Sequence, residues 1–168
     1  RMDASNRCTT LVHIANGYLY GGQPQQALAV LEDVQPPEKA LEMRGLVAGN
    51  KATCFLAAGE MDRAQTAMDE LRRIAADRNC KKDFVQKARH TLGYLQLCMD
   101  IARGRHADVG ALQKDFESSR APLHRLDVQY RIALALRHRG DRTGMEKSRE
   151  YLLENSGGTC YGELARAL

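Results

Sequence analysis

Apolar and polar residues recur along this 168-residue chain with the spacing of a helix over nearly its whole length. An apolar residue every three or four positions places one side of each helix against a core, because a helix turns once in about 3.6 residues. Short segments rich in glycine or proline interrupt the pattern. The pattern predicts nine helices, at about residues 6–20, 24–34, 38–58, 61–77, 83–103, 107–118, 122–140, 141–154 and 159–168.

Proline and aspartate mark where several of these helices are expected to begin. Pro24 and Pro122 suit the first turn of a helix, because proline lacks an N–H that this position does not use. Asp83 and Asp141 are predicted to cap the fifth and eighth helices. Alanine and leucine are the commonest residues and β-branched residues are scarce, so the composition also favours an all-α fold.

One glycine recurs after each of four long helices and before a shorter one. These glycines are Gly22, Gly59, Gly104 and Gly140, separated by 37, 45 and 36 residues. Repeats of this length indicate stacked helical hairpins, since one hairpin cannot bury its apolar face without a neighbour. We therefore expect a single domain over residues 1–168, with hairpins at about 6–35, 38–78, 83–119 and 122–155 and a terminal helix at 159–168.

The first hairpin resembles a tetratricopeptide repeat (TPR), a motif of two antiparallel helices. The residues that carry the resemblance are large apolar or aromatic side chains, small side chains at the helix crossing and a turn glycine: Leu11, Ile14, Ala15, Tyr18, Gly22, Ala27, Leu31 and Val34. The same order recurs in the second hairpin at Ala52, Phe55, Gly59, Ala64, Met68 and Leu71. The fourth has Ile132, Ala133, Leu136, Gly140, Met145 and Leu152.

The third hairpin departs from this pattern. Eleven residues, rather than seven, separate Gly93 from Gly104, and either Val109 or Ala111 fits the crossing of its second helix. The chain therefore resembles a divergent TPR protein, and a helical bundle without repeats stays open as the alternative fold.

The resemblance implies a right-handed α–α superhelix of about four hairpins, in which the first helix of each hairpin lines a concave groove. Small crossing residues would let the two helices of a hairpin approach closely. Peptides of partner proteins bind such a groove in this family. Mapped onto this chain, the groove residues are expected to be Val12, Asn16, Leu19, Leu46, Asn50, Thr53, Lys87, Tyr130, Leu134 and Arg137.

Some TPR proteins hold a C-terminal carboxylate with lysine, asparagine and arginine from successive first helices. Asn16, Asn50 and Lys87 match positions of that clamp, but Val12 and Thr91 stand where two of its cations would be. Two missing cations remove much of the attraction to a carboxylate. The sequence therefore favours ordinary surface asparagines over a carboxylate clamp.

The positive charge of the chain is concentrated in its third quarter. The formal net charge is +4, and residues 101–142, with nine basic and five acidic side chains, account for an excess of the same size. The arginines of this segment are Arg103, Arg105, Arg120, Arg125, Arg131, Arg137, Arg139 and Arg142. They indicate either a solvated surface or a partner of acidic character. Nucleic acid is disfavoured, because the overall charge is mild and aromatic residues make up only 5% of the chain.

No motif for catalysis, a cofactor or a metal ion stands out in the sequence. The five histidines are dispersed, the five cysteines form no CxxC, and we therefore expect reduced thiols and a cytoplasmic location. No apolar segment has the length of a membrane span. The chain opens on Arg1 and stops within a predicted helix, as a fragment of a longer protein would.

The function expected from these observations is a protein–protein interaction scaffold rather than an enzyme. The alternatives are a regulatory or sensory domain of a larger signalling or transcription protein and, less favoured, a helical repeat that binds nucleic acid. The terminal helix either caps the last hairpin or starts a further repeat. In the second case Leu164 and Leu168 would be left for a partner or for a second copy of the chain.

Overall fold

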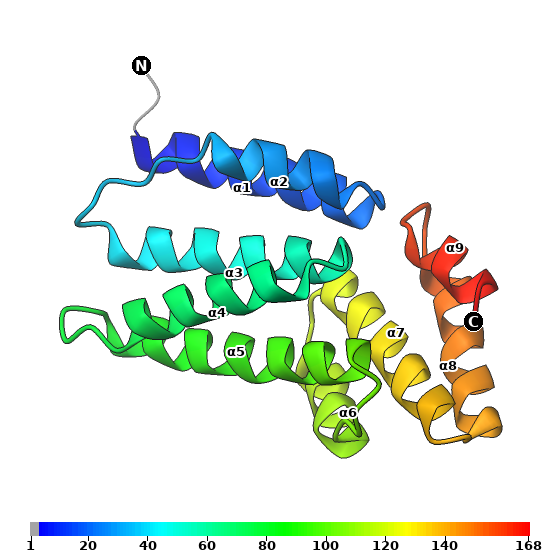
Figure 1. Ribbon diagram of the computed structural model, residues 1–168. Coiled ribbons are helices and arrows are strands. Elements are labelled where there is room, and N and C mark those ends of the chain that lie inside the picture. The colour runs from blue at the N-terminus through cyan, green and yellow to red at the C-terminus, as the bar shows by residue number, and fades with distance from the viewer. Residues whose placement is uncertain (1–3) are drawn as a thin grey trace. The chain divides into compact units, whose positions relative to one another are not determined.

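The computed structural model describes residues 4–168, and these residues form helices and turns with no strand. The helices are α1 (Ala4–Tyr20), α2 (Pro24–Glu32), α3 (Leu41–Ala57), α4 (Met61–Ala75), α5 (Lys82–Ala102), α6 (Val109–Ser118), α7 (Pro122–His138), α8 (Arg142–Asn155) and α9 (Tyr161–Arg166) (Figure 1). Each predicted helix corresponds to one of these elements. The all-α prediction is therefore confirmed.

The first residues of the helices test the predictions made from proline and aspartate. Pro24 and Pro122 occupy the first turns of α2 and α7, and the Asp141 carboxylate caps α8 by accepting a hydrogen bond from the Gly144 N–H at 2.9 Å. The prediction for Asp83 was wrong, because α5 already begins at Lys82 and Asp83 lies within its first turn. A carboxylate there still interacts favourably with the positive end of the helix dipole.

The third helix begins three residues later than predicted, at Leu41. Pro36 and Pro37 disfavour the helical conformation only at the residues before them, so the later start follows from the turn after the prolines. The Ala40 N–H then donates to the Pro37 carbonyl at 2.9 Å and closes a turn.

Four turns of the chain share one backbone conformation. Gly22, Gly59, Gly104 and Gly140 have φ between 68° and 78°, a left-handed region that side chains with a Cβ rarely adopt. In each turn the residue after the glycine donates its N–H to the carbonyl five positions back, at 2.8 to 3.0 Å. This is a Schellman motif, which satisfies carbonyls that the end of the helix would otherwise leave unbonded.

The described residues divide into two compact units. The first comprises the chain up to Leu19 together with Gln23–Gln96, and the second comprises Tyr20–Gly22 and Leu97–Leu168. Helix α5 thus contributes its first part to one unit and its end to the other. The stacking of all the hairpins into one right-handed superhelix stays a prediction.

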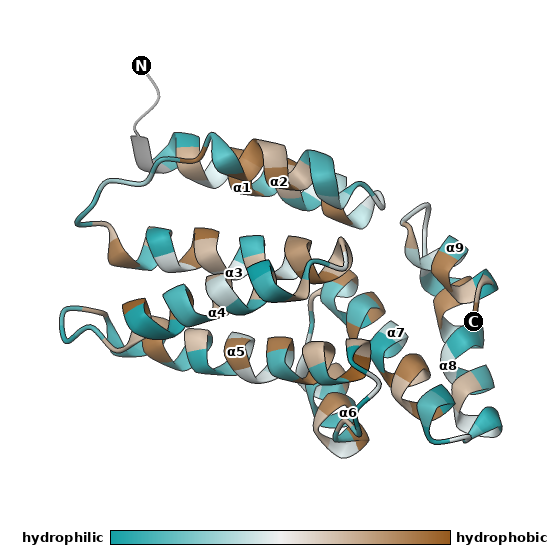
Figure 2. Cartoon of the chain, viewed as in Figure 1, coloured by the Kyte–Doolittle hydropathy of each residue, from teal (hydrophilic) through white to brown (hydrophobic). Residues whose placement is uncertain are grey.

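The core of the first unit lies where its helices cross. Four alanines predicted at helix crossings, Ala15, Ala27, Ala52 and Ala64, are fully buried. Helices α3, α4 and α5 lie side by side in this unit (Figure 1), and Ala48, Leu71 and Ala88 form a cluster where they meet. Each helix carries hydrophobic and hydrophilic residues together (Figure 2), as expected of helices with one buried side.

Two large residues of the first hairpin do not pack as the repeat pattern predicted. Ile14 and Tyr18 are 45% and 40% exposed, so they fill no space between hairpins. Phe55 stands at the same distance before its turn glycine as Tyr18 but is only 7% exposed. The Arg63 guanidinium lies 4.2 Å from the centre of the Phe55 ring and covers it.

The second unit is built around the packing of α9 on α7 and α8. Leu126, Leu152, Tyr161 and Ala165 are buried together, and Leu164 and Leu168 pack against them. This arrangement favours the capping role of the terminal helix. Oligomerisation through this helix stays a prediction.

A buried carboxylate also lies in this core. Asp127 is 7% exposed and lies 3.3 Å from the Arg131 guanidinium, one helical turn further along α7. It also forms a hydrogen bond with the Tyr161 side chain. Burial first and the Asp127 charge second raise the pKa of the Tyr161 hydroxyl above its usual range. Tyr161 therefore fastens α9 to α7 as a neutral hydroxyl.

Candidate functional site

A groove between α3 and α5 is the candidate site of the first unit. It has a volume of about 380 Å³ and is lined by residues of α3, α4 and α5: Glu42, Gly45, Leu46, Gly49, Asn50, Thr53, Leu71, Phe84, Lys87, Ala88 and Thr91. Small-molecule and peptide sites commonly have volumes of about 300–1,000 Å³. The groove is thus large enough to take one or a few side chains of a ligand.

Helical spacing places these residues on facing sides of α3 and α5. Along α3 the lining recurs at Glu42, Gly45, Gly49 and Thr53, and along α5 at positions 84, 87–88 and 91. Residues three or four apart share one side of a helix. Each of the two helices therefore presents one stripe of mixed polar and apolar residues, and the two stripes face each other across the groove.

The floor of the groove is apolar and tightly packed at one end. Leu71 and Ala88 are almost fully buried beneath it, with the Phe84 ring against them. A Cβ added to Gly45 would lie 2.3 Å from Cζ of Phe84, so the ring rests directly on the backbone of α3. Glycine at position 45 is what allows this approach. At Gly49 the space is larger, since an added Cβ would meet its nearest side-chain atoms at 3.6 and 3.8 Å.

The polar side chains of the groove differ in how they are already engaged. The Asn50 Nδ2 atom donates to the Leu46 carbonyl at 2.8 Å, and the Thr53 hydroxyl donates to the Gly49 carbonyl at 3.0 Å. Both groups keep acceptor oxygens for a ligand. Lys87 is exposed, and its ammonium group forms no hydrogen bond or ion pair within residues 4–168. An incoming carboxylate or carbonyl can therefore reach its ammonium group without displacing an existing partner.

Comparison of the chain with protein-family models, curated proteins and solved structures finds no match. The site must therefore be judged on its own geometry.

Four of the ten predicted groove residues come together in this site: Leu46, Asn50, Thr53 and Lys87. Leu46 is 42% exposed and is therefore available for contact with a ligand. Asn16 is half-buried on α1 and is not part of the groove lining.

Two predicted groove residues are corrected by the structure. Val12 and Leu19 are only 3% and 9% exposed and belong to the hydrophobic core. They lie on the same side of α1 as Cys8 and Ala15, which are also buried. Side chains enclosed in this way cannot line an open groove.

The remaining three predicted residues belong to the second unit. The Tyr130 ring packs near the buried Tyr161, with 6.1 Å between ring centres, and Leu134 is half-buried. Arg137 is exposed near the end of α7.

Sequence reasoning missed Glu42 and Phe84. Phe84 lies one helical turn before Ala88, so its position on the groove side of α5 follows once Lys87 is placed there. Glu42 was placed near the start of a helix but on no functional surface. Its carboxylate lies 3.9 Å from the Lys81 ammonium, and both side chains are exposed to solvent.

The arginines of the third quarter are not all available to a partner. Arg125 stacks on Phe116 at 3.8 Å and donates to the Phe116 carbonyl at 2.6 Å. Arg131 pairs with buried Asp127, and Arg139 donates to the Ala107 carbonyl at 2.6 Å. Three of the eight arginines thus hold the second unit together.

The thiols and histidines form no metal-binding group within the described part of the chain. No disulfide joins cysteines within residues 4–168, and burial raises the pKa of the Cys54 thiol to about 12. A buried thiol of this kind is a poor nucleophile. Nor does any helix in residues 4–168 combine the length and apolar character that a bilayer span requires.

Proposed function

We propose that this chain is a divergent TPR-like interaction module, and that the groove between α3 and α5 holds an extended peptide of a partner protein. The observation that carries the proposal is the convergence of Leu46, Asn50, Thr53 and Lys87 on one groove. The Schellman turn repeated after four helices, and the buried alanines at the predicted crossings, support the repeat assignment.

The lining suits a peptide better than a reacting small molecule. Leu46 and Phe84 offer apolar surface to a ligand side chain, while Asn50 and Thr53 offer oxygen atoms to backbone N–H groups. The groove lining contains no histidine, cysteine or serine, and no hydrogen bond joins its threonine, lysine and glutamate side chains to one another as a nucleophile and its base would require. Its chemistry is therefore that of recognition.

Because of Lys87, we expect the groove to prefer acidic peptides. Its ammonium lies on the groove side of α5 and is exposed, so a ligand carboxylate placed beside it forms a charge-assisted hydrogen bond. Glu42 would oppose a second carboxylate at the other end of the same lining. The ligand that suits the charges of both Lys87 and Glu42 is a peptide with a single acidic residue near Lys87 and apolar residues on either side of it.

Selection from a phage-displayed library of random peptides tests the proposal. The affinity of a selected peptide is then measured by isothermal titration for the wild-type chain, Lys87→Gln and Lys82→Gln. Both lysines are exposed on α5, but only Lys87 lines the groove. We expect Lys87→Gln to weaken binding about three- to tenfold and Lys82→Gln to leave it within about twofold, as for partly exposed charge pairs.

Two results would contradict the proposal. One is equal affinity of both variants for every selected peptide, which would place binding elsewhere. The other is a failure of the library to yield any peptide that binds the folded chain.

A further inference from the structure

Two of the four glycine turns lie next to each other in the second unit. The turn at Gly104 links α5 to α6, and the turn at Gly140 links α7 to α8. The Arg139 Nη2 atom crosses between them and donates to the Ala107 carbonyl at 2.6 Å. This hydrogen bond joins residues 103–107 to residues 137–142, and the two segments together are named here the arginine turns.

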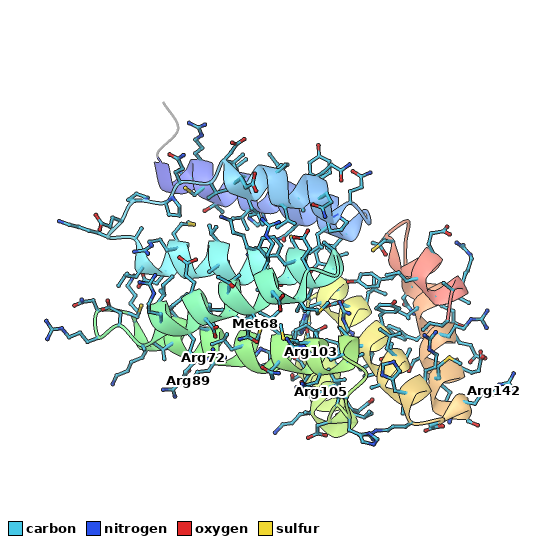
Figure 3. All side chains as sticks on the ribbon, in the orientation of Figure 1. Met68, Arg72, Arg89, Arg103, Arg105 and Arg142 are labelled. Carbon is cyan, nitrogen blue, oxygen red and sulfur yellow. The ribbon has the colours of Figure 1, made fainter. Side chains whose placement is uncertain are left out.

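The arginine turns are rich in exposed cations. They carry Arg103, Arg105, His106, Arg137, His138, Arg139 and Arg142, each of them exposed. Figure 3 shows Arg103 and Arg105 near the end of α5, and Arg142 projecting from the start of α8. The guanidinium groups of three of these arginines, Arg103, Arg137 and Arg142, form no hydrogen bond or ion pair among the described residues.

Three neighbouring carboxylates, Asp100, Asp108 and Asp141, offset part of this charge, and five arginines against three carboxylates leave an excess of two positive charges. Asp108 caps α6 by accepting from the Ala111 N–H at 3.1 Å, and Asp141 caps α8. Asp100 lies 3.7 Å from the Arg105 guanidinium. The unpaired arginines thus retain their positive potential toward solvent.

The backbone of the turn does not require these arginines. The Gly22 turn is flanked by Gly21 and Gln23, and the Gly59 turn by Ala58 and Glu60, yet both have the same conformation. The Gly104 turn has arginine on both sides of its glycine. Since uncharged or acidic residues make the same turn elsewhere in the chain, the cations of the arginine turns need another explanation.

We propose that the arginine turns are a docking surface for an acidic segment of a partner protein. Arginine guanidinium groups pair with carboxylates through two parallel hydrogen bonds, and unpaired ones on adjacent turns fit an aspartate- and glutamate-rich strand of chain. Nucleic acid fits less well. Neither turn contains a phenylalanine, tyrosine or tryptophan on which a base could stack, and neither is a helix or ribbon that enters a groove of duplex DNA.

A fluorescein-labelled oligoglutamate peptide is the probe, and fluorescence anisotropy at low salt is the readout. The test variant is Arg103→Gln/Arg137→Gln. The matched control, Arg73→Gln/Arg89→Gln, removes the same charge from exposed arginines of α4 and α5 in the first unit; Arg89 is labelled in Figure 3. We expect the test variant to bind about fivefold more weakly and the control to stay within about twofold of wild type, the scale of two exposed ion pairs.

Equal weakening of both variants would overturn the proposal, because attraction would then follow net charge alone. Absence of peptide binding by the wild-type chain at low salt would overturn it too. Tighter binding of oligothymidylate of equal charge, lost in the test variant only, would replace the acidic partner with nucleic acid. Lys87→Gln separates this surface from the groove, since oligoglutamate binding to the arginine turns should be unchanged in it.

Discussion

Because Phe84 lies so close to the backbone of α3, replacing Gly45 by alanine should change the free energy of unfolding in the opposite direction to the same replacement at Gly93. Gly45 and Gly93 both lie inside helices, where replacing glycine by alanine gains about 0.8–1 kcal/mol of helix propensity. At Gly93 no atom lies within 4 Å of an added Cβ, so this gain should appear in full. At Gly45 the added Cβ would lie 2.3 Å from the Phe84 ring, which must move.

The loss at Gly45 can be estimated from the burial of that ring. Full burial of a phenylalanine side chain is worth about 1.5–3 kcal/mol, and half-buried Phe84 stands to lose about half of that. Forcing the helices apart adds about 1–3 kcal/mol. Against a propensity gain of about 1 kcal/mol, Gly45→Ala should be destabilising by at least about 1 kcal/mol. The two variants should therefore differ by at least about 2 kcal/mol in the free energy of unfolding.

Thermal and urea unfolding followed by circular dichroism measure this difference. For a chain of this size a difference of about 2 kcal/mol corresponds to about 4–8 °C in Tm. The double variant Gly45→Ala/Phe84→Ala is the decisive control. Without the ring, alanine at position 45 should stabilise relative to Phe84→Ala alone. If Gly45→Ala is as stable as Gly93→Ala, the ring does not rest on α3 and the groove described here is wrong.

Two further predictions concern the helix caps and the core of the second unit. Asp141→Ala should destabilise the chain by about 1 kcal/mol, because it removes the cap of α8, whereas Asp141→Asn should destabilise it far less. Urea unfolding measures both losses, and equal losses would contradict the capping role of Asp141. Because burial raises the pKa of Tyr161 in the folded state, its hydroxyl binds a proton more tightly there than in the unfolded chain. Its contribution to stability should be retained below pH about 10 and lost as the pH rises further, so Tyr161→Phe should have a flatter stability profile in alkaline urea titrations.

The helices and turns of this fold could be predicted because their signals are local. Helical periodicity, proline in the first turn and glycine at positive φ each act over a few residues. Gly104 illustrates this well. It forms the same turn as the other three glycines although the helix before it is longer and the repeat pattern around it is irregular.

It was harder to predict which side chains of α1 are buried and which could line a groove, because α1 carries two apolar stripes. One comprises Cys8, Val12, Ala15 and Leu19, and the other comprises Leu11, Ile14 and Tyr18. The repeat resemblance favoured burial of the second stripe together with Ala15, whereas the structure buries the whole of the first stripe. Both stripes have helical spacing, and periodicity alone cannot say which one meets the next helix. The groove itself arises from α3 and α5, whose proximity is a tertiary property that no local signal encodes.

Gly49 links the packing of the groove to its proposed function. Unlike Gly45, it has room for a methyl group, since the nearest side-chain atoms would lie at 3.6 and 3.8 Å from the added Cβ. Packing of the free chain therefore does not require glycine there, and alanine should stabilise α3 by about 0.5–1 kcal/mol. A peptide lying in the groove would require it, because a methyl group on the lining narrows the approach to the backbone of α3. Gly49→Ala should accordingly raise the Tm and weaken a library-selected peptide, while Gly93→Ala raises the Tm and leaves binding unchanged. A Gly49→Ala variant that is more stable and binds as well as wild type would show that the ligand does not use this part of the groove.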